Sequence, residues 1–278
     1  MDTPELQVKA AALRALHVPG RPLLLLNAWD GASAVVIARA GASAIATTSA
    51  GAANALGSGD GQRITREQML GMVATIAAAV DLPVTADMEA GYGDEPADAD
   101  ATARGVLEAG AVGLNLEDTC DGAEPLLPIE RFVAKIAAVR SVAAETEVPL
   151  VLNARTDVFI GEVGDPATRL ARAIERGRAY LAAGADCIFV PAVADPGQIT
   201  ALVEGIGGPV SVLAGPGSPP LAELAALGVA RISVGSGPYR AALALARRMA
   251  DGAYGRGTLD AMTADQIPFA EVEALLER

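Results

Sequence analysis

Two acidic residues stand two positions apart at the end of a β-like run of this chain. The stretch PVTADMEAGYG, residues 83–93, carries Asp87 and Glu89 just ahead of two closely spaced glycines. Side chains of a strand alternate between its faces, so both carboxylates are expected on one face. Two carboxylates so close together repel each other unless water, a cation or a basic substrate group compensates their charge. Because no helix cap is needed inside a strand, this spacing predicts a functional site.

Polar side chains gather in the same way at the ends of four further strand-like runs. They are Asn27 and Asp30; Thr47, Thr48 and Ser49; Asn115, Glu117 and Asp118; and Asn153, Arg155 and Asp157. The three runs that follow end in uncharged residues, so the predicted site lies toward the first five runs. For Asp30 and Asp118, capping of the next helix is the alternative interpretation.

The expected ligand atoms are oxygens, with no cysteine or histidine among them. Such a set suits a hard cation, and Mg²⁺ typically takes one or two carboxylates, several waters and oxygens of its substrate. We therefore expect Mg²⁺, with Mn²⁺ as an alternative. Arg155 is the only cation at these strand ends and its guanidinium fits a substrate carboxylate, while Asn153 on the same face is expected to contact the substrate as well. The implied substrate is an anion that chelates the metal, such as a 2-oxo acid.

Chelation of a 2-oxo acid favours one type of reaction. The metal withdraws electron density from the carboxylate and 2-oxo oxygens, so cleavage of the bond to the next carbon's substituent leaves an enolate whose charge is already neutralised. Such a cleavage requires no cofactor besides the ion.

The histidine and the cysteines narrow the chemistry further. His17 is the only histidine and precedes the first strand-like run, so we expect it at the surface and exclude a histidine-based triad. Cys120 follows Glu117 by three residues in an expected loop, where it is a candidate proton donor or nucleophile or else a loop residue without a role. Two cysteines provide neither a disulfide framework nor a zinc-type spacing, which favours a reducing compartment.

The elements that must position these residues follow a regular pattern. Eight short apolar runs alternate with longer helical patterns, at residues 23–28, 43–49, 83–89, 112–117, 149–155, 187–192, 209–214 and 230–235. Four runs follow a glycine in phrases such as AGAVGL, which suits a helix C-cap leading into a strand. Eight such units in 278 residues predict an α/β fold of the (β/α)₈ TIM-barrel type. A doubly wound open sheet, usually of about five or six strands, is the alternative.

A barrel would place the polar strand ends around one cavity, because active sites of barrel enzymes lie at the C-terminal ends of the strands. No Pro/Ser-rich linker divides residues 1–278, so one domain is expected. Helices are expected at residues 66–80, 98–110, 167–184 and 238–250. The tail, at about 251–278, is expected to be a helical extension that packs on another subunit.

Composition excludes several classes of partner. The formal net charge is −13 and no lysine-rich run is present, so nucleic acid and anionic membranes are not expected partners. The N-terminal segment does not resemble a signal peptide, and no stretch is apolar for long enough to span a bilayer. We therefore expect a cytoplasmic protein that acts on a small molecule.

The motifs, taken in order, resemble those of a known family. They are LNAWDGASA, ATTSAGAANALGSGDG, TADMEAGYG, GLNLED, LNARTDV, GADCIFVPA and LGVARISVG, spread over residues 26–235. Together they resemble the isocitrate lyase/phosphoenolpyruvate mutase superfamily, and most closely its compact bacterial members. The resemblance implies an α/β barrel whose eighth helix is exchanged between subunits of a homodimer or homotetramer, and Mg²⁺-dependent cleavage or formation of C–C or P–C bonds in 2-oxo acids.

The resemblance also implies roles for individual residues. Asp87 would be the direct metal ligand, and metal-bound waters would be held by Asp60, Glu89 and Glu117. The carboxylate of the oxo acid would be bound by Ser49 with the backbone amides of Ala50 and Gly51, and Arg155 would bind the distal end of the substrate. The pocket floor would be shaped by Trp29 and Asp30.

The loop after the fourth run differs from the patterns of the family's well-known reactions. The lyases carry a Lys-Cys-Gly type motif there and the mutases a longer loop with Lys and Asn, whereas this chain has DTCDGAEPLLP at 118–128. We therefore expect a Mg²⁺-dependent lyase that cleaves a C–C bond of a small 2-oxo or 2-hydroxy dicarboxylate, as in oxaloacetate decarboxylation or methylisocitrate-like cleavage. The alternatives are phosphoenolpyruvate or phosphonopyruvate mutase or hydrolase chemistry, and a barrel that binds a 2-oxo acid without turnover.

Overall fold

The computed structural model describes residues 2–120, 125–264 and 266–277. Each of the eight predicted runs forms one strand, except the first, which forms the two short strands β1 and β2, and the strands are shorter than the predicted runs. The strands are β1 (Leu23–Leu25), β2 (Asn27–Ala28), β3 (Ile45–Thr47), β4 (Val84–Asp87), β5 (Gly113–Glu117), β6 (Val151–Arg155), β7 (Cys187–Phe189), β8 (Val210–Leu213) and β9 (Arg231–Ser233).

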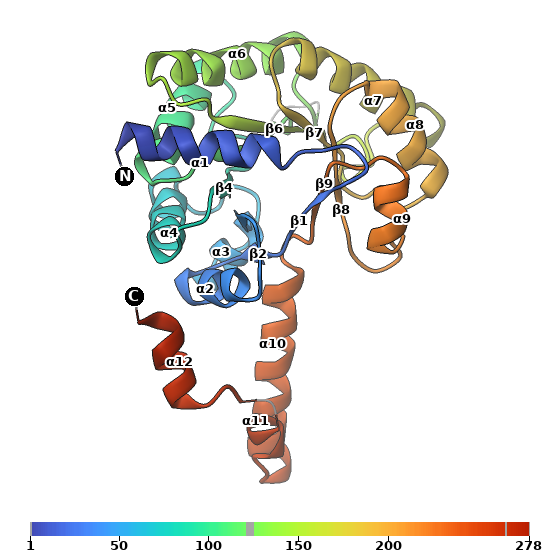
Figure 1. Ribbon diagram of the computed structural model, residues 1–278. Coiled ribbons are helices and arrows are strands. Elements are labelled where there is room, and N and C mark those ends of the chain that lie inside the picture. The colour runs from blue at the N-terminus through green and yellow to red at the C-terminus, as the bar shows by residue number, and fades with distance from the viewer. Residues whose placement is uncertain (1, 121–124, 265, 278) are drawn as a thin grey trace.

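All paired strands are parallel, and they follow the order β1-β9-β8-β7-β6-β5-β4-β3-β2. The sheet therefore begins and ends with β1 and β2, which only Leu26 separates along the chain. These two labels mark halves of the first predicted run, and through this run the sheet closes into a barrel (Figure 1). The predicted eight-stranded α/β barrel is confirmed.

Helices alternate with the strands. They are α1 (Thr3–Ala15), α2 (Gly31–Arg39), α3 (Ser49–Ala55), α4 (Arg66–Ala79), α5 (Pro96–Glu108), α6 (Ile129–Glu145), α7 (Pro166–Ala182), α8 (Pro196–Ile206), α9 (Leu221–Ala226), α10 (Gly237–Ala250), the π-helical turn η1 (Asp251–Arg256), α11 (Asp260–Thr263) and α12 (Phe269–Leu276). The four helices expected from the apolar spacing correspond to α4, α5, α7 and α10. Helix α3, directly after β3, was not predicted.

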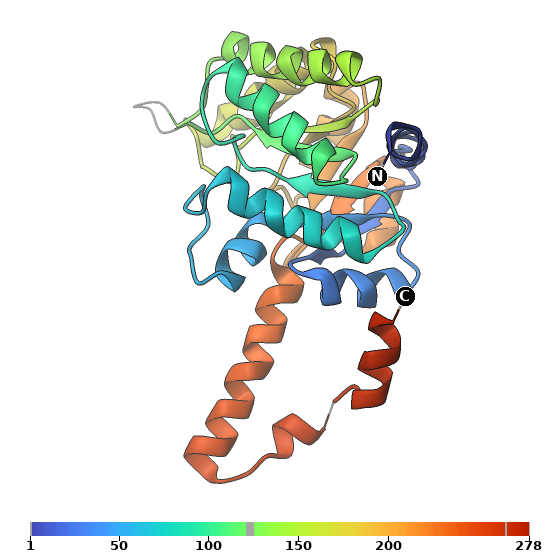
Figure 2. The same ribbon diagram turned by 90° about the vertical axis from the view of Figure 1, so that its left-hand side faces the viewer.

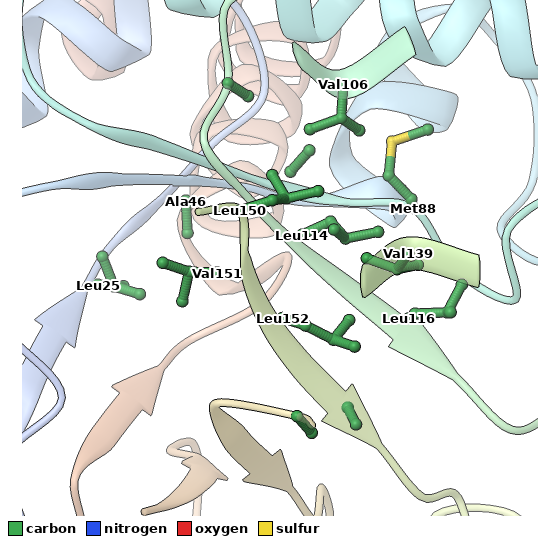
Figure 3. Close-up of a cluster of buried hydrophobic side chains, with 14 of the residues drawn as sticks. Leu25, Ala46, Met88, Val106, Leu114, Leu116, Val139, Leu150, Val151 and Leu152 are labelled. Carbon is green, nitrogen blue, oxygen red and sulfur yellow. The ribbon is translucent and has the colours of Figure 1, made fainter. Parts of the chain in front are cut away.

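An apolar layer between the strands and their covering helices forms much of the core. Figure 3 shows part of it beside β5 and β6, where the labelled residues include Leu114, Leu116, Leu150, Leu152, Val106 and Val139. All six are fully buried. Full burial of each such side chain contributes roughly 1.5–3 kcal/mol, so this outer layer supplies the apolar burial that holds the barrel together.

The inner face of the barrel, in contrast, carries polar residues in register. Residues paired across adjacent strands point to the same face of a sheet. One row across β4 to β7 contains Asp87, Asn115, Asn153 and Cys187. The next row toward the strand ends contains Glu117, Arg155 and Phe189. The barrel thus brings the predicted site residues of β4, β5 and β6 to one interior.

The segment after α1 folds over the opposite end of the barrel. His17 is 8% exposed there, and its Nδ1 lies 2.9 Å from the carbonyl oxygen of Leu13. The prediction of a surface histidine is therefore wrong, because the chain returns over the barrel interior before it enters β1. Burial, with a contribution from the Arg231 charge, lowers the pKa of His17 to about 4.

Helix α10 does not pack along the outside of the barrel. It runs away from it, and α12 returns toward α2 (Figures 1 and 2). The outward side chains of the first strand run are consequently exposed, at 39% for Leu24 and 43% for Leu26. They line a groove of about 480 Å³ that also includes Ile37 of α2. In the ranges that the structure describes, no helix is long and apolar enough to cross a membrane.

Candidate active site

Asp87 ends β4 and is oriented from three sides. Its Oδ2 accepts hydrogen bonds from the backbone N–H of Ser49 at 3.1 Å and from the Ser49 hydroxyl at 2.8 Å. Its Oδ1 faces Nδ2 of Asn115 at 3.5 Å, and its own N–H donates to Oγ1 of Thr47 at 2.8 Å. Ser49 is the first residue of α3, so the chain reversal after β3 supplies both donors to the carboxylate.

Glu89 reaches the same region by a different route from the one predicted. Strand alternation predicts Glu89 on the same face as Asp87, but β4 ends at Asp87 and Glu89 has a left-handed backbone with φ of 51°. The prediction that both carboxylates lie on one face of a strand is therefore wrong. Glu89 is nevertheless buried near Asp87, because the chain turns sharply where the strand stops.

The Glu89 carboxyl is held in an environment that opposes its charge. Its Oε2 accepts a hydrogen bond from the backbone N–H of Gln62, and its buried Oε1 has no hydrogen-bond partner among the described residues. Burial first, and then the charges of Asp87 and Asp60, raise the pKa of Glu89 to about 7. Asp60 itself lies in the exposed loop between α3 and α4, close enough for its charge to act on Glu89.

Arg155 ends β6 between two carboxylates. Its Nη1 pairs with Oε2 of Glu117 at 2.8 Å, and its Nη2 donates to Oδ2 of Asp157 at 2.8 Å. The guanidinium lies 5.7 Å from the ring centroid of Phe189. Burial raises the pKa of Glu117, against the effect of its ion pair with Arg155. The Arg155 guanidinium therefore lies at the strand ends, as predicted, and is oriented by Glu117 and Asp157. A substrate carboxylate would compete with these two acids for it.

Two asparagines and a buried arginine link these groups beneath the site. Nδ2 of Asn153 donates to Oδ1 of Asn115 at 2.8 Å, and Nη2 of Arg231 donates to the same oxygen at 3.1 Å. With its oxygen taken by two donors, Asn115 is left to direct its amide hydrogens toward Asp87. Arg231 is not among the residues predicted for the site, although alternation along ARISVG places it on the same face as Ser233.

The two aspartates with an alternative interpretation differ in their surroundings. Asp30 is the N-cap of α2, where its carboxylate accepts from Ser33 N at 2.7 Å, so the capping interpretation is confirmed. Asp118 caps none of the described helices. It is fully buried, and its oxygens accept from Asp157 N at 3.0 Å, Arg176 Nη1 at 2.9 Å and the Tyr180 hydroxyl at 2.7 Å. It fastens α7 to the end of β5.

The remaining predicted residues lie around α3 and after β5. Trp29 makes an edge contact with Tyr239 at 5.6 Å between ring centroids. Ala50 follows Ser49 in the first turn of α3. The backbone N–H of Gly51 already donates to Oγ1 of Thr48 at 3.3 Å, so a substrate oxygen would share this donor with Thr48. Cys120 is half-buried and forms no disulfide, and the four residues after it lie outside the described ranges.

The donor set fits Mg²⁺ held largely through water. Within residues 2–120, 125–264 and 266–277, no three His, Cys, Asp or Glu side chains cluster closely enough to hold a metal by themselves. Mg²⁺ commonly takes one or two protein carboxylates and fills its other positions with water and substrate oxygens. The oriented carboxylate of Asp87 and the unpartnered, buried Oε1 of Glu89 provide such ligands, and a cation would relieve the repulsion among Asp87, Glu89 and Asp60.

Comparison with models of known protein families shows to which family this chain belongs. A family model described as phosphoenolpyruvate phosphomutase matches residues 13–253, which include all the strands and the site. The chain belongs to the isocitrate lyase/phosphoenolpyruvate mutase superfamily. The resemblance indicated by the sequence motifs is thereby confirmed.

Individual relatives within this superfamily carry different activities. An uncharacterized Mycobacterium tuberculosis protein is 37% identical over 263 residues, which are 94% of each chain. The 2-methylisocitrate lyase of Escherichia coli is 30% identical over 207 residues, 72% of this chain and 67% of that enzyme. The oxaloacetate decarboxylase of Rhodopseudomonas palustris strain BisB18 is 34% identical over 171 residues, 58% of this chain and 54% of that enzyme.

Solved structures of the superfamily share the barrel. A candidate lyase/mutase from Burkholderia cenocepacia J2315 matches with a TM-score of 0.90 at 38% identity, over 98% of this chain and 96% of that one. Phosphonopyruvate hydrolase, solved with oxalate and Mg²⁺, matches with a TM-score of 0.83 at 27% identity, over 96% and 94%. This chain is an enzyme of the same superfamily of lyases and mutases.

Proposed function

We propose that this protein is a Mg²⁺-dependent lyase that cleaves a C–C bond of a small 2-oxo or 2-hydroxy dicarboxylate. The observation that carries the proposal is the convergence of Asp87, Glu89 and Glu117 with one cation, Arg155, at adjacent strand ends. The metal end of such a substrate would meet carboxylates and its distal carboxylate would meet a guanidinium. Oxaloacetate decarboxylation is the specific reaction of a dicarboxylate that fits, and methylisocitrate-like cleavage is the corresponding reaction of a 2-hydroxy acid with one further carboxylate.

In this proposal the side chains bind the metal, its waters or the substrate. Asp87 holds the metal directly, and Asp60, Glu89 and Glu117 hold its waters. When bound, Mg²⁺ would stabilise the enolate that remains after C–C cleavage. Ser49 would bind the substrate carboxylate by redirecting its one hydroxyl hydrogen, which in this structure is donated to Oδ2 of Asp87 at 2.8 Å.

Arg155 and Cys120 complete the assignment. Arg155 binds the distal carboxylate with its guanidinium plane fixed by Asp157 and by the ring of Phe189. Asn153 supports the substrate from the inner row. Cys120 is the candidate source of the proton that the enolate must receive, because it follows β5 by three residues and its side chain is only half-buried.

A second candidate is P–C bond chemistry on phosphonopyruvate or phosphoenolpyruvate. It is favoured by the family model and by the phosphonopyruvate hydrolase structure that shares the barrel over nearly the whole chain. A third candidate, a barrel that binds a 2-oxo acid without turnover, shares the same metal site.

Product analysis separates the three candidates. The purified protein with Mg²⁺ is incubated with oxaloacetate, 2-methylisocitrate and phosphonopyruvate, and products are followed by proton and phosphorus NMR. The proposal expects consumption of oxaloacetate or 2-methylisocitrate and no change in phosphonopyruvate, and expects Asp87→Ala to abolish turnover while the circular dichroism spectrum is retained. Consumption of phosphonopyruvate alone would support the second candidate. Mg²⁺ and oxo-acid binding without any turnover would support the third.

We also propose that two copies exchange the helical segment that follows β9. Barrel strands are normally covered by helices, yet α10 leaves the barrel and the outer face of the first strand run lines an open groove. Exposed apolar residues occur on the departing segment, including Leu243, Leu259, Ile267 and Phe269. A neighbour's α10 laid in the groove would cover both surfaces in a homodimer or homotetramer.

A further inference from the structure

The backbone after Asp87 forms an unusual turn, here named the 89–93 loop. Four of its five residues have positive φ: Glu89 at 51°, Gly91 at 85°, Tyr92 at 61° and Gly93 at 151°. Glycine adopts such angles readily, but Glu and Tyr do so at an energetic cost. Something outside the loop must therefore hold it in this conformation.

Side chains from three helices hold the carbonyl oxygens of this loop. Nζ of Lys135, on α6, donates to the carbonyls of Ala90 at 2.5 Å and Gly93 at 2.6 Å. Oγ1 of Thr102, on α5, donates to the carbonyl of Gly91 at 2.8 Å. Nη2 of Arg66, on α4, lies 3.4 Å from the same carbonyl and 3.1 Å from that of Tyr92. Four successive carbonyls thus have side-chain donors.

Lys135 is the buried cation among these donors. It is fully buried, although it carries an ammonium group that prefers water. The described contacts of Nζ are to the two carbonyls, and no carboxylate lies within ion-pair distance of it among the described residues. A buried cation directed at two backbone oxygens on either side of a turn is well suited to fixing that turn.

The loop in turn fixes the acidic site. Gln62 bridges the two, because its N–H donates to Oε2 of Glu89 while its Oε1 accepts from Tyr92 N at 2.6 Å. If the loop relaxed to ordinary φ values, both the direction of the Glu89 side chain and this bridge would change. The position of Glu89 beside Asp87 therefore depends on the carbonyl contacts made by Lys135.

We propose that Lys135 is a positioning residue of the active site, which locks the 89–93 loop so that Glu89 faces the metal position beside Asp87. The proposal rests on the proposed function in so far as Glu89 belongs to the metal site. Lys135 touches neither substrate nor metal in this role. It acts through the backbone of Ala90 and Gly93.

The test compares Lys135→Met with two further variants. Thr102→Val is nearly isosteric and removes only the hydroxyl that donates to Gly91. Arg140→Met is the control on the same helix, because Arg140 donates to the carbonyl of Leu150 at 2.8 Å and pairs with Asp186 at 2.9 Å, and neither partner belongs to the 89–93 loop. The measurements are hydrogen exchange of the Gly91 and Tyr92 amides, Mg²⁺ affinity by isothermal titration calorimetry, and the melting temperature.

We expect Lys135→Met to speed exchange of these two amides at least about tenfold and to weaken Mg²⁺ binding about tenfold, as loss of a supporting contact to a metal ligand does. Thr102→Val should shift both quantities in the same direction by less, and Arg140→Met should shift neither. If Lys135→Met only lowers the melting temperature, as Arg140→Met does, the proposal is wrong. If the wild-type protein binds no Mg²⁺, the proposed function fails instead, while the exchange data still decide whether Lys135 locks the loop.

Discussion

The hydroxyl of Ser49, at the start of α3, donates to Oδ2 of Asp87, at the end of β4, over 2.8 Å. The Ser49 backbone N–H donates to the same oxygen at 3.1 Å. Ser49→Ala would remove one of these two donors and leave the helix start intact. We expect Mg²⁺ affinity, measured by calorimetry, to fall about tenfold. Ser218→Ala, which removes a hydroxyl that accepts from Gly215 N in an exposed turn, is the control and should bind Mg²⁺ as the wild type does.

Arg155 makes a prediction about stability as well as activity. Arg155→Met leaves Glu117 and Asp157 without their counter-charge at a position where these side chains are only 12% and 6% exposed. Removing one partner of a buried ion pair costs about 3–5 kcal/mol, so urea denaturation should show a loss of that order, together with loss of turnover. The matched control is Arg104→Met, whose ion pairs with Asp100 and Glu145 are exposed. It should cost little stability, because solvent screens exposed ion pairs.

His17 predicts a specific dependence of stability on pH. Its pKa is lowered from 6.5 to about 4 by burial and by Arg231, with Arg14 acting in the same direction and the hydrogen bond to the Leu13 carbonyl and the charge of Asp186 opposing them. The unfolded chain therefore binds a proton at this site between about pH 6.5 and 4 while the folded chain does not. The contribution of neutral His17 to the free energy of unfolding is fully present above pH 6.5. It falls by about 3 kcal/mol as the pH falls to about 4.

His17→Gln should remove this dependence. We expect the difference in unfolding free energy between wild type and variant to change by about 3 kcal/mol between pH 7 and pH 4, with the wild type losing more. Urea denaturation at intermediate pH values measures it. A difference that stays constant across this range would contradict the prediction.

The proposed exchange of helices predicts the effect of charge in the groove. Leu26→Glu places a carboxylate on the outer face of the first strand run, where a neighbour's helix would otherwise cover an apolar surface. We expect light scattering with size exclusion to show a shift from dimer or tetramer toward monomer. Val8→Glu, at a position 70% exposed on α1, is the control and should leave the assembly unchanged. A wild-type protein that is monomeric would refute the proposed exchange.

Substitution of Cys120 is expected to affect kcat without affecting Mg²⁺ affinity. If its thiol supplies the proton to the enolate, Cys120→Ser should lower kcat by about 100-fold or more and leave Mg²⁺ affinity unchanged. Steady-state kinetics with the substrate identified by NMR measures the first quantity and calorimetry the second. Full activity in the serine and alanine variants would assign Cys120 no role in the reaction.

Much of the architecture could be predicted from short-range patterns. Apolar runs separated by helical spacing identified all eight strands of the barrel, and the two-residue period placed Asp87, Asn115 and Asn153 on one face, as the register confirms. The capping of α2 by Asp30 also follows from local sequence. These features depend on residues close together in the chain, whose backbone preferences and side-chain periodicity are visible in the sequence.

Other features depend on partners that are distant in the chain. Glu89 leaves the strand geometry because donors from α4, α5 and α6, among them Lys135, hold the carbonyls of the following turn. Asp118 is a buried anchor because Arg176, 58 residues later, meets it. His17 is buried because the chain folds back over Arg231, 214 residues away. The sequence alone determined the barrel and the acidic strand ends, since these follow from local periodicity. The orientation of each acid was decided by tertiary structure, because it is set by hydrogen bonds and burial among residues that only the closed barrel brings together.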